Sequence, residues 1–359
     1  MGKRSIVPFG PQHPVLPEPI HLDLVLEDEK VVEAVPSIGF VHRGLEKLVE
    51  KKDFQQYVYV AERICGICSF MHGMGYCAAV ENIMNIEIPP RAKYLRTIWC
   101  ELSRMHSHML WLGLLADAFG FESLFMQCWR IREKILDMFE MSTGGRVIFS
   151  VNMIGGQRRD MDRDMLALFE TVLKDIEQDL SEITKTFLND YTVNSRLKGV
   201  GYLTKEQAHE LGAVGPFMRA SGIALDNRKL GYAAYPDIDF EPITSTEGDC
   251  YARCDVRIHE IFQSIDIIRQ AIGKIPDGEV AAPVKGFPKG EYFMRVEQPR
   301  GEAIYYVKAN GTKFLDRVRV RTPTFANLPA MLQTLKGCQL ADVPILILTI
   351  DPCISCTER

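Results

Sequence analysis

The sequence predicts a mainly helical protein of the α+β class, in which a bundle of long helices forms the core and two small β parts accompany it. Apolar residues recur at steps of three and four over 92–119, 125–141, 160–187 and 250–271, which is the period of packed helices. Segments that alternate apolar and polar residues, typical of strands, occur near the start of the chain and again after residue 276.

The N-terminal region predicts a β-hairpin, with strands at 21–27 and 31–35 and a turn at 28–30. A helix is expected to run through Leu48 toward Asp53. The following segment, 54–86, is expected to be helical, with a Cys-x-x-Cys near a helix end.

The second half predicts shorter elements. They are a helix at 203–211 capped by Thr204, a hairpin of 292–297 and 302–307, a strand at 314–321, a helix at 327–335 and a buried strand at 343–350. We expect one domain over 1–359: a β-hairpin entry at 1–40, a helical core at 41–275, a β appendage at 276–325, and a C-terminal helix, strand and metal-ligand tail at 326–359.

Composition excludes several classes of protein. A hydrophobic fraction of 47% and a charged fraction of 25% are ordinary for a globular protein. The net charge of −5 argues against nucleic acid as a partner. The apolar run at 343–350 is too short to cross a bilayer, and no signal segment is expected at the start of the chain. Ten cysteines do not make a disulfide scaffold, so free thiols or metal ligands in a reducing cytosol are expected.

Two Cys-x-x-Cys pairs, Cys65 with Cys68 and Cys353 with Cys356, supply four soft ligands. Thiolates select zinc, nickel, copper(I) or iron–sulfur clusters rather than magnesium or calcium. Structural zinc sites place their pairs within roughly 15–20 residues of each other, whereas 285 positions separate Cys68 from Cys353. A structural zinc site stays open as an alternative, but a local zinc knuckle is disfavoured. The remaining cysteines, including Cys250 and Cys254, are expected to be buried thiols.

The residues around these pairs resemble a known family. Arg-x-Cys-Gly-x-Cys-x-x-x-His at 63–72, together with Asp-Pro-Cys-x-x-Cys at 351–356, resembles the large subunit of NiFe hydrogenases. The Arg-Gly-x-Glu at 43–46, the Glu-x-Pro-Arg-Gly at 297–301 and the Thr-Pro-Thr at 322–324 are similar to further motifs of that family.

Other segments are similar to the quinone-site subunit of respiratory complex I. They are Gly-Pro-Gln-His-Pro at 10–14, the segment 42–47, Arg-Ala-Ser-Gly at 219–222 and Asp-Asn-Arg-Lys at 226–229. Both sets together resemble the energy-converting, membrane-bound (Ech-type) hydrogenases. The complex I subunit lacks the cysteine pairs, and this chain keeps all four, which favours the hydrogenase.

The resemblance implies a Ni–Fe centre, with nickel held by Cys65, Cys68, Cys353 and Cys356. Cys68 and Cys356 would bridge to an iron that carries CO and two cyanides. Cysteines of the nickel site such as Cys353 would take a proton as hydrogen splits.

The resemblance also implies roles for residues around the centre. Glu46 would relay the proton away from the centre. Arg300 would lie over the open metal position and pair with Asp351, and Pro299 would lie beside Arg300 at the centre. His72 would donate a hydrogen bond to a bridging sulfur, and Thr324 would form a hydrogen bond with a cyanide.

Two departures from the family are visible. The chain has Thr357-Glu358-Arg359 where many members carry a histidine that binds an additional Mg or Fe ion, so that ion is left open. In His106-Ser107-His108, a serine stands where NiFe hydrogenases of the respiratory type have an aspartate.

The implied function is the reversible reduction of protons to H2 with electrons from reduced ferredoxin. The implied partners are a small subunit with a proximal 4Fe–4S cluster, other iron–sulfur subunits and integral membrane subunits that translocate ions. The chain itself would lie at the cytoplasmic face of the membrane. Two alternatives stay open: a non-catalytic connecting subunit of the complex I type, and the large subunit of a formate-linked or CO-linked hydrogenase.

Overall fold

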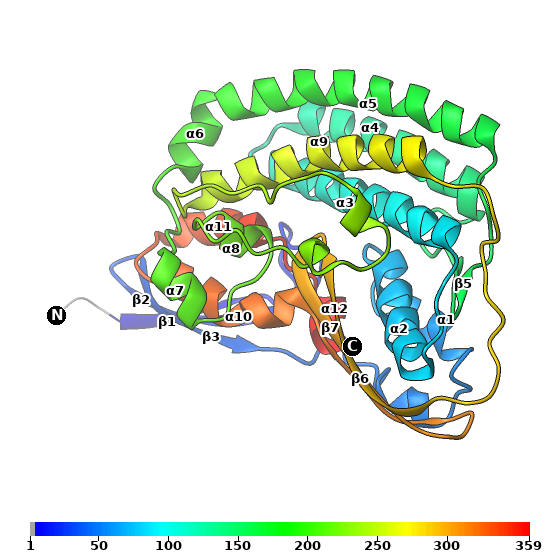
Figure 1. Cartoon of the computed structure of the whole chain (residues 1–359). Helices are drawn as coiled ribbons and strands as arrows, with labels where there is room; N and C mark the ends of the chain where they lie inside the picture. The colour runs from blue at the N-terminus through cyan, green and yellow to red at the C-terminus, as the bar shows by residue number, and fades with distance from the viewer. Residues whose placement is uncertain (1–3) are drawn as a thin grey trace.

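The structure is a computed structural model and describes residues 4–359. Its upper part in Figure 1 consists of four long helices, α3 (Pro90–Ala118), α4 (Glu122–Thr143), α5 (Arg163–Asn189) and α9 (Cys250–Lys274). α3 packs against α4 and α9, and α5 lies across α4 and α9 on the outer side. The four predicted long helices and the α+β class are therefore confirmed, with helix ends shifted by a few residues.

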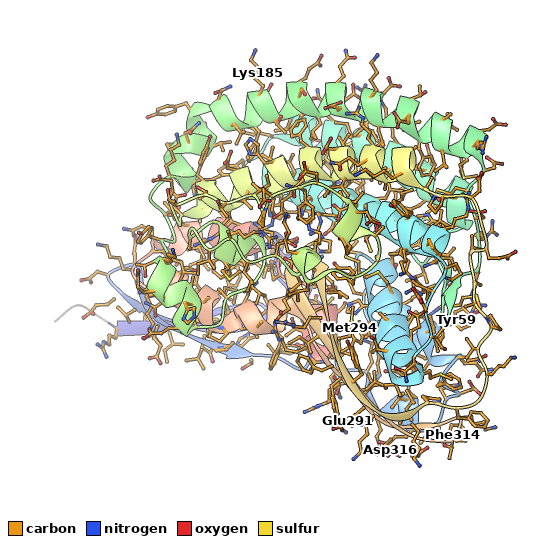
Figure 2. All side chains as sticks on the ribbon, viewed as in Figure 1. Tyr59, Lys185, Glu291, Met294, Phe314 and Asp316 are labelled. Atoms are coloured by element: carbon orange, nitrogen blue, oxygen red, sulfur yellow. The ribbon has the colours of Figure 1, made fainter. Side chains whose placement is uncertain are left out.

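The outermost and innermost long helices differ in how they are buried. α5 buries one stripe that includes Leu166 and Leu173, while residues such as Lys185 project outward from it (Figure 2). α3 is buried on nearly every side, and its charged residues Arg96, Glu101 and Arg104 are buried with its apolar ones. A helix in this position must find partners for its charges inside the protein.

Side-chain caps fix where several helices begin. Asp162 accepts a hydrogen bond from the backbone of Met165 at the start of α5, and Asp249 accepts one from Ala252 at the start of α9. The predicted Thr204 cap forms a full capping box with Gln207 at the start of α7 (Lys205–Glu210).

The N-terminal sheet is antiparallel in the order β1 (Arg4–Phe9), β2 (His21–Glu27), β3 (Lys30–Ser37). Asp28 and Glu29 connect β2 to β3 with φ values of 49° and 66°, as a two-residue hairpin turn requires. The hairpin was predicted, but β1 was not. β1 is an edge strand with only one buried residue, Phe9, so its alternation is too weak to detect.

The second sheet, antiparallel in the order β6 (Lys289–Gln298), β7 (Gly301–Asn310), β8 (Leu315–Arg321), packs against α2 (Ser69–Met84). Gln298 pairs with Gly301, so Pro299 and Arg300 form a two-residue connection between β6 and β7. The other end of this sheet carries the exposed side chains of Glu291 and Phe314 (Figure 2).

Short elements connect and close these layers. They are η1 (Lys47–Glu50), α1 (Tyr57–Glu62), β4 (Asn152–Met153), β5 (Gly156–Gln157), α6 (Tyr191–Leu197), α8 (Pro216–Arg219), η2 (Asn227–Leu230), η3 (Tyr235–Asp237), α10 (Pro323–Leu335), η4 (Leu340–Asp342), α11 (Val343–Ile350) and α12 (Ile354–Glu358). Within residues 4–359, none of the helices combines the length and the apolar character needed to span a membrane.

Three predictions about individual elements are wrong. The helix expected to run through Leu48 toward Asp53 is limited to the short 3-10 helix η1, which ends at Glu50. The apolar run at 343–350 forms helix α11 instead of a strand; Pro344 lies in its first turn, and it packs against α3, α9 and α10. A short run buried on all sides carries no periodicity that separates a helix from a strand. The predicted helix over 54–86 is divided into α1 and α2 by the loop that carries the first cysteine pair.

Candidate metal centre

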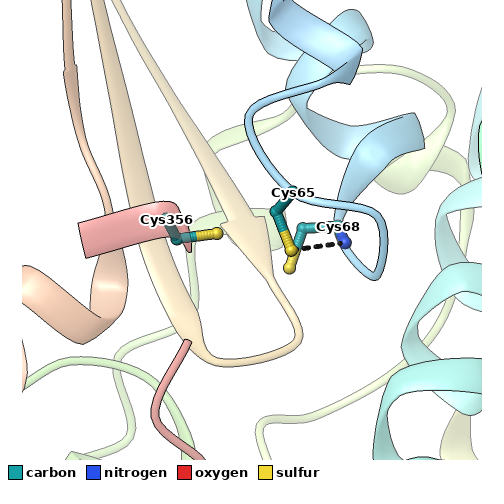
Figure 3. A group of neighbouring side chains, drawn as sticks. All are labelled: Cys65, Cys68 and Cys356. Atoms are coloured by element: carbon teal, nitrogen blue, oxygen red, sulfur yellow. Dashed lines mark hydrogen bonds between the residues drawn. The ribbon is translucent and has the colours of Figure 1, made fainter. Parts of the chain in front are cut away.

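The first cysteine pair lies in the loop between α1 and α2. Cys68 is the residue that precedes the first turn of α2, and its backbone N–H donates to Cys65 Sγ at 3.5 Å (Figure 3). This contact holds both sulfurs on the same side of the loop. The N-terminus of a helix also favours a thiolate next to it.

The second pair repeats this geometry between α11 and α12. Asp351 ends α11 in the left-handed conformation, with φ of 59°, and so turns the chain away from the helix axis. Cys353 precedes α12, and Cys356 N–H donates to Cys353 Sγ at 3.4 Å. Each Cys-x-x-Cys therefore forms the same compact loop.

The fold brings the two pairs together. Cys65 Sγ lies 3.4 Å from Cys353 Sγ, and the sulfurs of Cys65, Cys68 and Cys356 all lie within 4.8 Å of one another. Figure 3 shows Cys356 facing the Cys65–Cys68 loop from α12. None of the four side chains is more than 3% exposed. Within residues 4–359, Cys65, Cys68 and Cys356 are the one group of three or more His, Cys, Asp or Glu side chains whose ligand atoms converge in this way.

The electrostatics of the cluster call for a cation. Hydrogen bonds from the neighbouring thiols, Cys353 first, hold the pKa of Cys65 well below its ordinary value. Hydrogen bonding to Cys353, Cys65 and Cys68, together with burial, raises the pKa of Cys356 well above its ordinary value. A negative charge on one thiol therefore opposes ionisation of its neighbours, and a bound cation would offset that repulsion. Four converging, buried sulfurs therefore fit a soft metal such as nickel.

His72 approaches the cluster from α2. Its Nε2 lies 3.4 Å from Cys356 Sγ, and its Nδ1 is hydrogen-bonded to the hydroxyl of Tyr305 on β7. Burial lowers the pKa of His72 to about 4 and raises that of Tyr305, so both groups are neutral. If Cys356 is a metal-bound thiolate, its sulfur can only accept, so Nε2–H would donate to the sulfur and the Tyr305 hydroxyl would donate to Nδ1.

Arg300 reaches the cluster from the β6–β7 connection. It donates to Cys68 Sγ at 3.4 Å and to Ser107 Oγ at 3.3 Å. It also donates to the carboxylate and the backbone carbonyl of Asp351, both at 2.8 Å. The predicted pair of Arg300 with Asp351 is present, and it joins the β6–β7 connection to the loop of the second cysteine pair.

Two glycines in contact fix the position of this connection. A side chain on Gly301 would meet the backbone of Gly215 at 2.8 Å, and one on Gly215 would meet Gly301 at 2.3 Å. Both residues also have positive φ. Glycine is therefore required on both sides of the contact, and Arg300 is held close to the sulfurs as a result.

Thr324 and Pro299 lie at the edge of the site. Thr324 Oγ1 accepts a hydrogen bond from Cys353 N–H at 3.1 Å, in the first turn of α10. Pro299 is buried next to Arg300. Thr324 thus contacts the second ligand loop directly, and Pro299 fixes the turn that carries Arg300.

Glu46 contacts none of the four sulfurs. It accepts hydrogen bonds from Val320 N–H at 2.9 Å, from Arg359 Nε at 2.9 Å and from Arg319 at 3.1 Å. Burial raises its pKa, but these donors outweigh burial, so the pKa lies below its ordinary value. Glu46 lines a cavity of about 250 Å³ that also reaches Thr357, next to Cys356.

A buried network of ion pairs extends away from the site. Arg219 donates to Glu260 and Glu297, each at 2.7 Å, and His108 contacts the other oxygen of Glu260 at 3.0 Å. Arg104 donates to the backbone carbonyl of Glu297 at 3.0 Å. Because Glu297 lies near the end of β6, this network supports the strand that carries Arg300. Arg219 belongs to a segment singled out for its similarity to complex I.

Sequence reasoning did not find two residues that contact the site. Tyr305 could have been suspected from its inward position in the alternation of β7. Glu18, in the loop after β1, accepts hydrogen bonds from the backbone and side chain of Ser355, at 3.0 Å and 2.5 Å. No motif distinguishes Glu18 from a surface glutamate.

Comparisons with known proteins agree with the motifs. Residues 118–287 and 283–359 match the family described as the 49 kDa subunit of respiratory-chain NADH dehydrogenase. Residues 43–117 match the family described as nickel-dependent hydrogenase.

Similar proteins include both hydrogenase subunits and subunits of NADH-quinone oxidoreductases. The chain is 39% identical over 379 residues to the alpha subunit of the membrane-bound hydrogenase of Pyrococcus furiosus, covering 98% of this chain and 87% of that protein. It is 35% identical over 387 residues to an NADH-quinone oxidoreductase subunit of Solibacter usitatus, covering 100% of this chain and 95% of that protein.

A solved structure shares the whole fold. It is a chain of the membrane-bound sulfane sulfur reductase, an archaeal respiratory membrane complex, with a TM-score of 0.95 and 31% identity, covering 99% of this chain and 98% of that one. The relatives are oxidoreductase subunits, several of them from membrane-bound complexes. The chain therefore belongs to the family that unites the nickel-dependent hydrogenases with the 49 kDa-type subunits of respiratory NADH dehydrogenases.

Proposed function

We propose that this chain is the catalytic subunit of an energy-converting NiFe hydrogenase, which reversibly reduces protons to H2 with electrons from reduced ferredoxin. The observation that carries the proposal is the convergence of four buried cysteine sulfurs with Arg300 and His72. Membership of the family and 39% identity to a membrane-bound hydrogenase subunit support it.

The four cysteines would hold the metals. Cys65, Cys68, Cys353 and Cys356 would bind nickel, and Cys68 and Cys356 would be shared with an iron carrying CO and two cyanides. When bound, this centre supplies the redox-active, electrophilic position at which H2 is split or formed. The additional Mg or Fe ion is not part of the proposal, because Thr357-Glu358-Arg359 stands where many members of the family carry a metal-binding histidine.

Hydrogen bonding divides the four sulfurs into two kinds. Cys68 and Cys356, the proposed bridging ligands, have side-chain donors, Arg300 and His72 respectively. Cys65 and Cys353 contact each other, and their donors from outside the cysteine cluster, within residues 4–359, are limited to backbone N–H groups. A sulfur with fewer strong donors is more basic, which supports Cys353 as the ligand that takes the proton.

Arg300 and Thr324 would act on the open side of the centre. The guanidinium of Arg300 stays charged at any physiological pH, and its pair with Asp351 fixes its orientation. It would polarise hydrogen and exclude competing cations. Thr324 Oγ1 accepts from Cys353 N–H, so its own hydroxyl hydrogen would be free to bond a cyanide.

Glu46 would carry the proton onward. It lies in the cavity that reaches Thr357, which donates from its hydroxyl to the Cys353 carbonyl at 2.8 Å. A carboxylate with a lowered pKa accepts a proton only transiently and passes it on readily.

The proposed partners follow from the family. They are a small subunit with a proximal 4Fe–4S cluster, other iron–sulfur subunits, integral membrane subunits that translocate ions, and ferredoxin as electron donor. The chain would be a peripheral subunit at the cytoplasmic face of the membrane. Assays of H2 formation with reduced ferredoxin, formate or CO as the electron source would separate a ferredoxin-linked complex from formate-linked and CO-linked ones.

A non-catalytic connecting subunit of the complex I type is the second candidate. The match of 118–287 and 283–359 to the NADH dehydrogenase family favours it. In that case the cysteines would hold no Ni–Fe centre, and the buried network around Arg219 would be the shared functional part.

Infrared spectroscopy, with nickel and iron quantified on the same purified complex, tests the proposal. We expect CO and cyanide stretching bands together with one nickel and one iron per chain. Zinc in place of nickel would indicate the structural alternative. The absence of all three metals and of the bands would indicate the connecting subunit.

Replacing Glu46 by Gln is expected to lower the rate at which the complex exchanges H2 with solvent deuterons by about 10²-fold. A positioned general acid or base contributes a rate factor of about that size. Nickel content should not change, since Gln can still accept from Val320 N–H. Glu50→Gln in η1 is the matched control, because within residues 4–359 the ion pair of Glu50 is with the exposed Lys47. If Glu46→Gln also lost nickel, Glu46 would be structural.

A further inference from the structure

Arg43, in the loop between β3 and η1, is an exposed residue with an unusual set of partners. Its guanidinium donates to the backbone carbonyls of Arg63 at 3.0 Å, Ile64 at 2.8 Å and Ser355 at 3.0 Å. Arg43 has no carboxylate partner within residues 4–359. The effect of such an arginine lies in holding these main-chain carbonyls in fixed positions, and not in neutralising a negative charge.

The three carbonyls belong to both ligand loops. Arg63 and Ile64 directly precede Cys65, and Ser355 lies between Cys353 and Cys356. Arg43 therefore bridges two segments that are about as far apart in sequence as the 288 positions between Cys65 and Cys353. A planar guanidinium with five N–H donors can span such a set, whereas a lysine ammonium is a single point of charge.

Residues 39–42, which directly precede Arg43, are themselves hydrogen-bonded to the helix that follows Cys353. The carboxylate of Glu358, in α12, accepts from the backbone N–H groups of Gly39 and Val41, each at 2.5 Å. His42 Nδ1 contacts the carbonyl of Glu358 at 2.6 Å. The segment that carries Arg43 is therefore attached to α12 at several points.

The second ligand loop is also held from its other side. Glu18 accepts from Ser355 N–H and its hydroxyl, while Arg43 donates to the carbonyl of Ser355. Within residues 4–359, the hydrogen bonds of Glu18 all come from this loop, whereas Arg43 donates to both loops. Within the described chain, Arg43 is thus the side chain that ties the carbonyls of the two loops to each other.

We infer that Arg43 is a positioning residue that sets the distance between the two cysteine pairs and thereby the geometry offered to the metal. The inference rests on the proposed function in one respect, that the four cysteines hold nickel. Metal–ligand bonds tolerate deviations of about 0.2 Å, so a small separation of the loops changes the site. Residues that orient metal ligands typically change metal affinity by about 10–100-fold when replaced.

The test compares Arg43→Gln and Arg43→Lys with the wild-type complex. Nickel per chain is measured after dialysis against a chelator, and the positions and widths of the CO and cyanide bands are recorded. Arg163→Gln is the control, because Arg163 is an exposed arginine whose partner is the exposed Asp277. Thermal unfolding is recorded for every variant.

We expect both Arg43 variants to lose nickel about 10-fold more readily than wild type and to show broadened or shifted bands, with the control unchanged. Full recovery in Arg43→Lys would mean that charge alone is sufficient, which would overturn the inference. Unchanged nickel and bands in Arg43→Gln would also overturn it. Wild-type protein without nickel would instead refute the proposed function, so the two failures are distinguishable.

Discussion

Replacing Cys65 by Ser is expected to abolish both nickel retention and hydrogen turnover. A serine hydroxyl remains protonated at neutral pH and is a hard oxygen donor, so it does not replace a thiolate at a soft metal. Cys65 Sγ is also the sulfur in contact with Cys353 and with the N–H of Cys68. Loss of this ligand would leave three sulfurs and an incomplete coordination sphere.

The measurement is nickel per chain in the purified complex, together with H2 formation. Cys338→Ser is the matched control, since Cys338 lies outside the cluster and is only partly buried. It should retain nickel and activity at the wild-type level. Nickel at the wild-type level in Cys65→Ser would show that the ligand assignment is wrong.

Replacing Glu260 by Gln is expected to destabilise the fold by about 3–5 kcal/mol, the typical cost of removing one partner from a buried ion pair. Glu260 accepts from Arg219 and His108, and all three are buried. Burial opposes ionisation of Glu260, but Arg219 outweighs it and holds the pKa of the carboxyl below its ordinary value. Gln would leave Arg219 with less negative charge around it.

Thermal unfolding at a fixed scan rate measures this effect. Glu177→Gln is the control, because Glu177 pairs with Arg269 on the surface, where an ion pair contributes about 0–1 kcal/mol. Since the pKa of Glu260 is lowered on folding, its contribution is present above the pKa of the unfolded state and is lost as the pH falls. Equal melting temperatures for both variants would contradict the argument.

The long helices could be predicted because their apolar residues repeat with the helical period. α5 is the clearest example, with one buried stripe and one exposed face. α11 was mispredicted because all its residues except Pro344 are buried, and uniform burial leaves no period to detect. β1 was missed because its pairing depends on the backbone, while its side chains are mostly exposed.

The contacts of the site could be predicted only for residues that lie close together in the sequence at a spacing typical of metal ligands. Cys65, Cys68 and His72 share one loop and the first turn of a helix, so their spacing fixes their relation. The residues that come from distant strands and loops, such as Tyr305 and Glu18, are brought in by tertiary structure alone. Buried charges such as Glu260 were also hidden, because in a sequence pattern a charged residue indicates a solvent-exposed face.

The 288 positions between Cys65 and Cys353 also have a consequence for biosynthesis. At about 5–20 residues per second, a ribosome needs about 15–60 s to add the second pair after the first. During that interval the nascent chain contains only the first pair of the four clustered cysteines, which is half of the proposed metal site. The complete set of four sulfur ligands therefore exists only after the second pair has been translated, so a metal that needs all four can be bound only after that point.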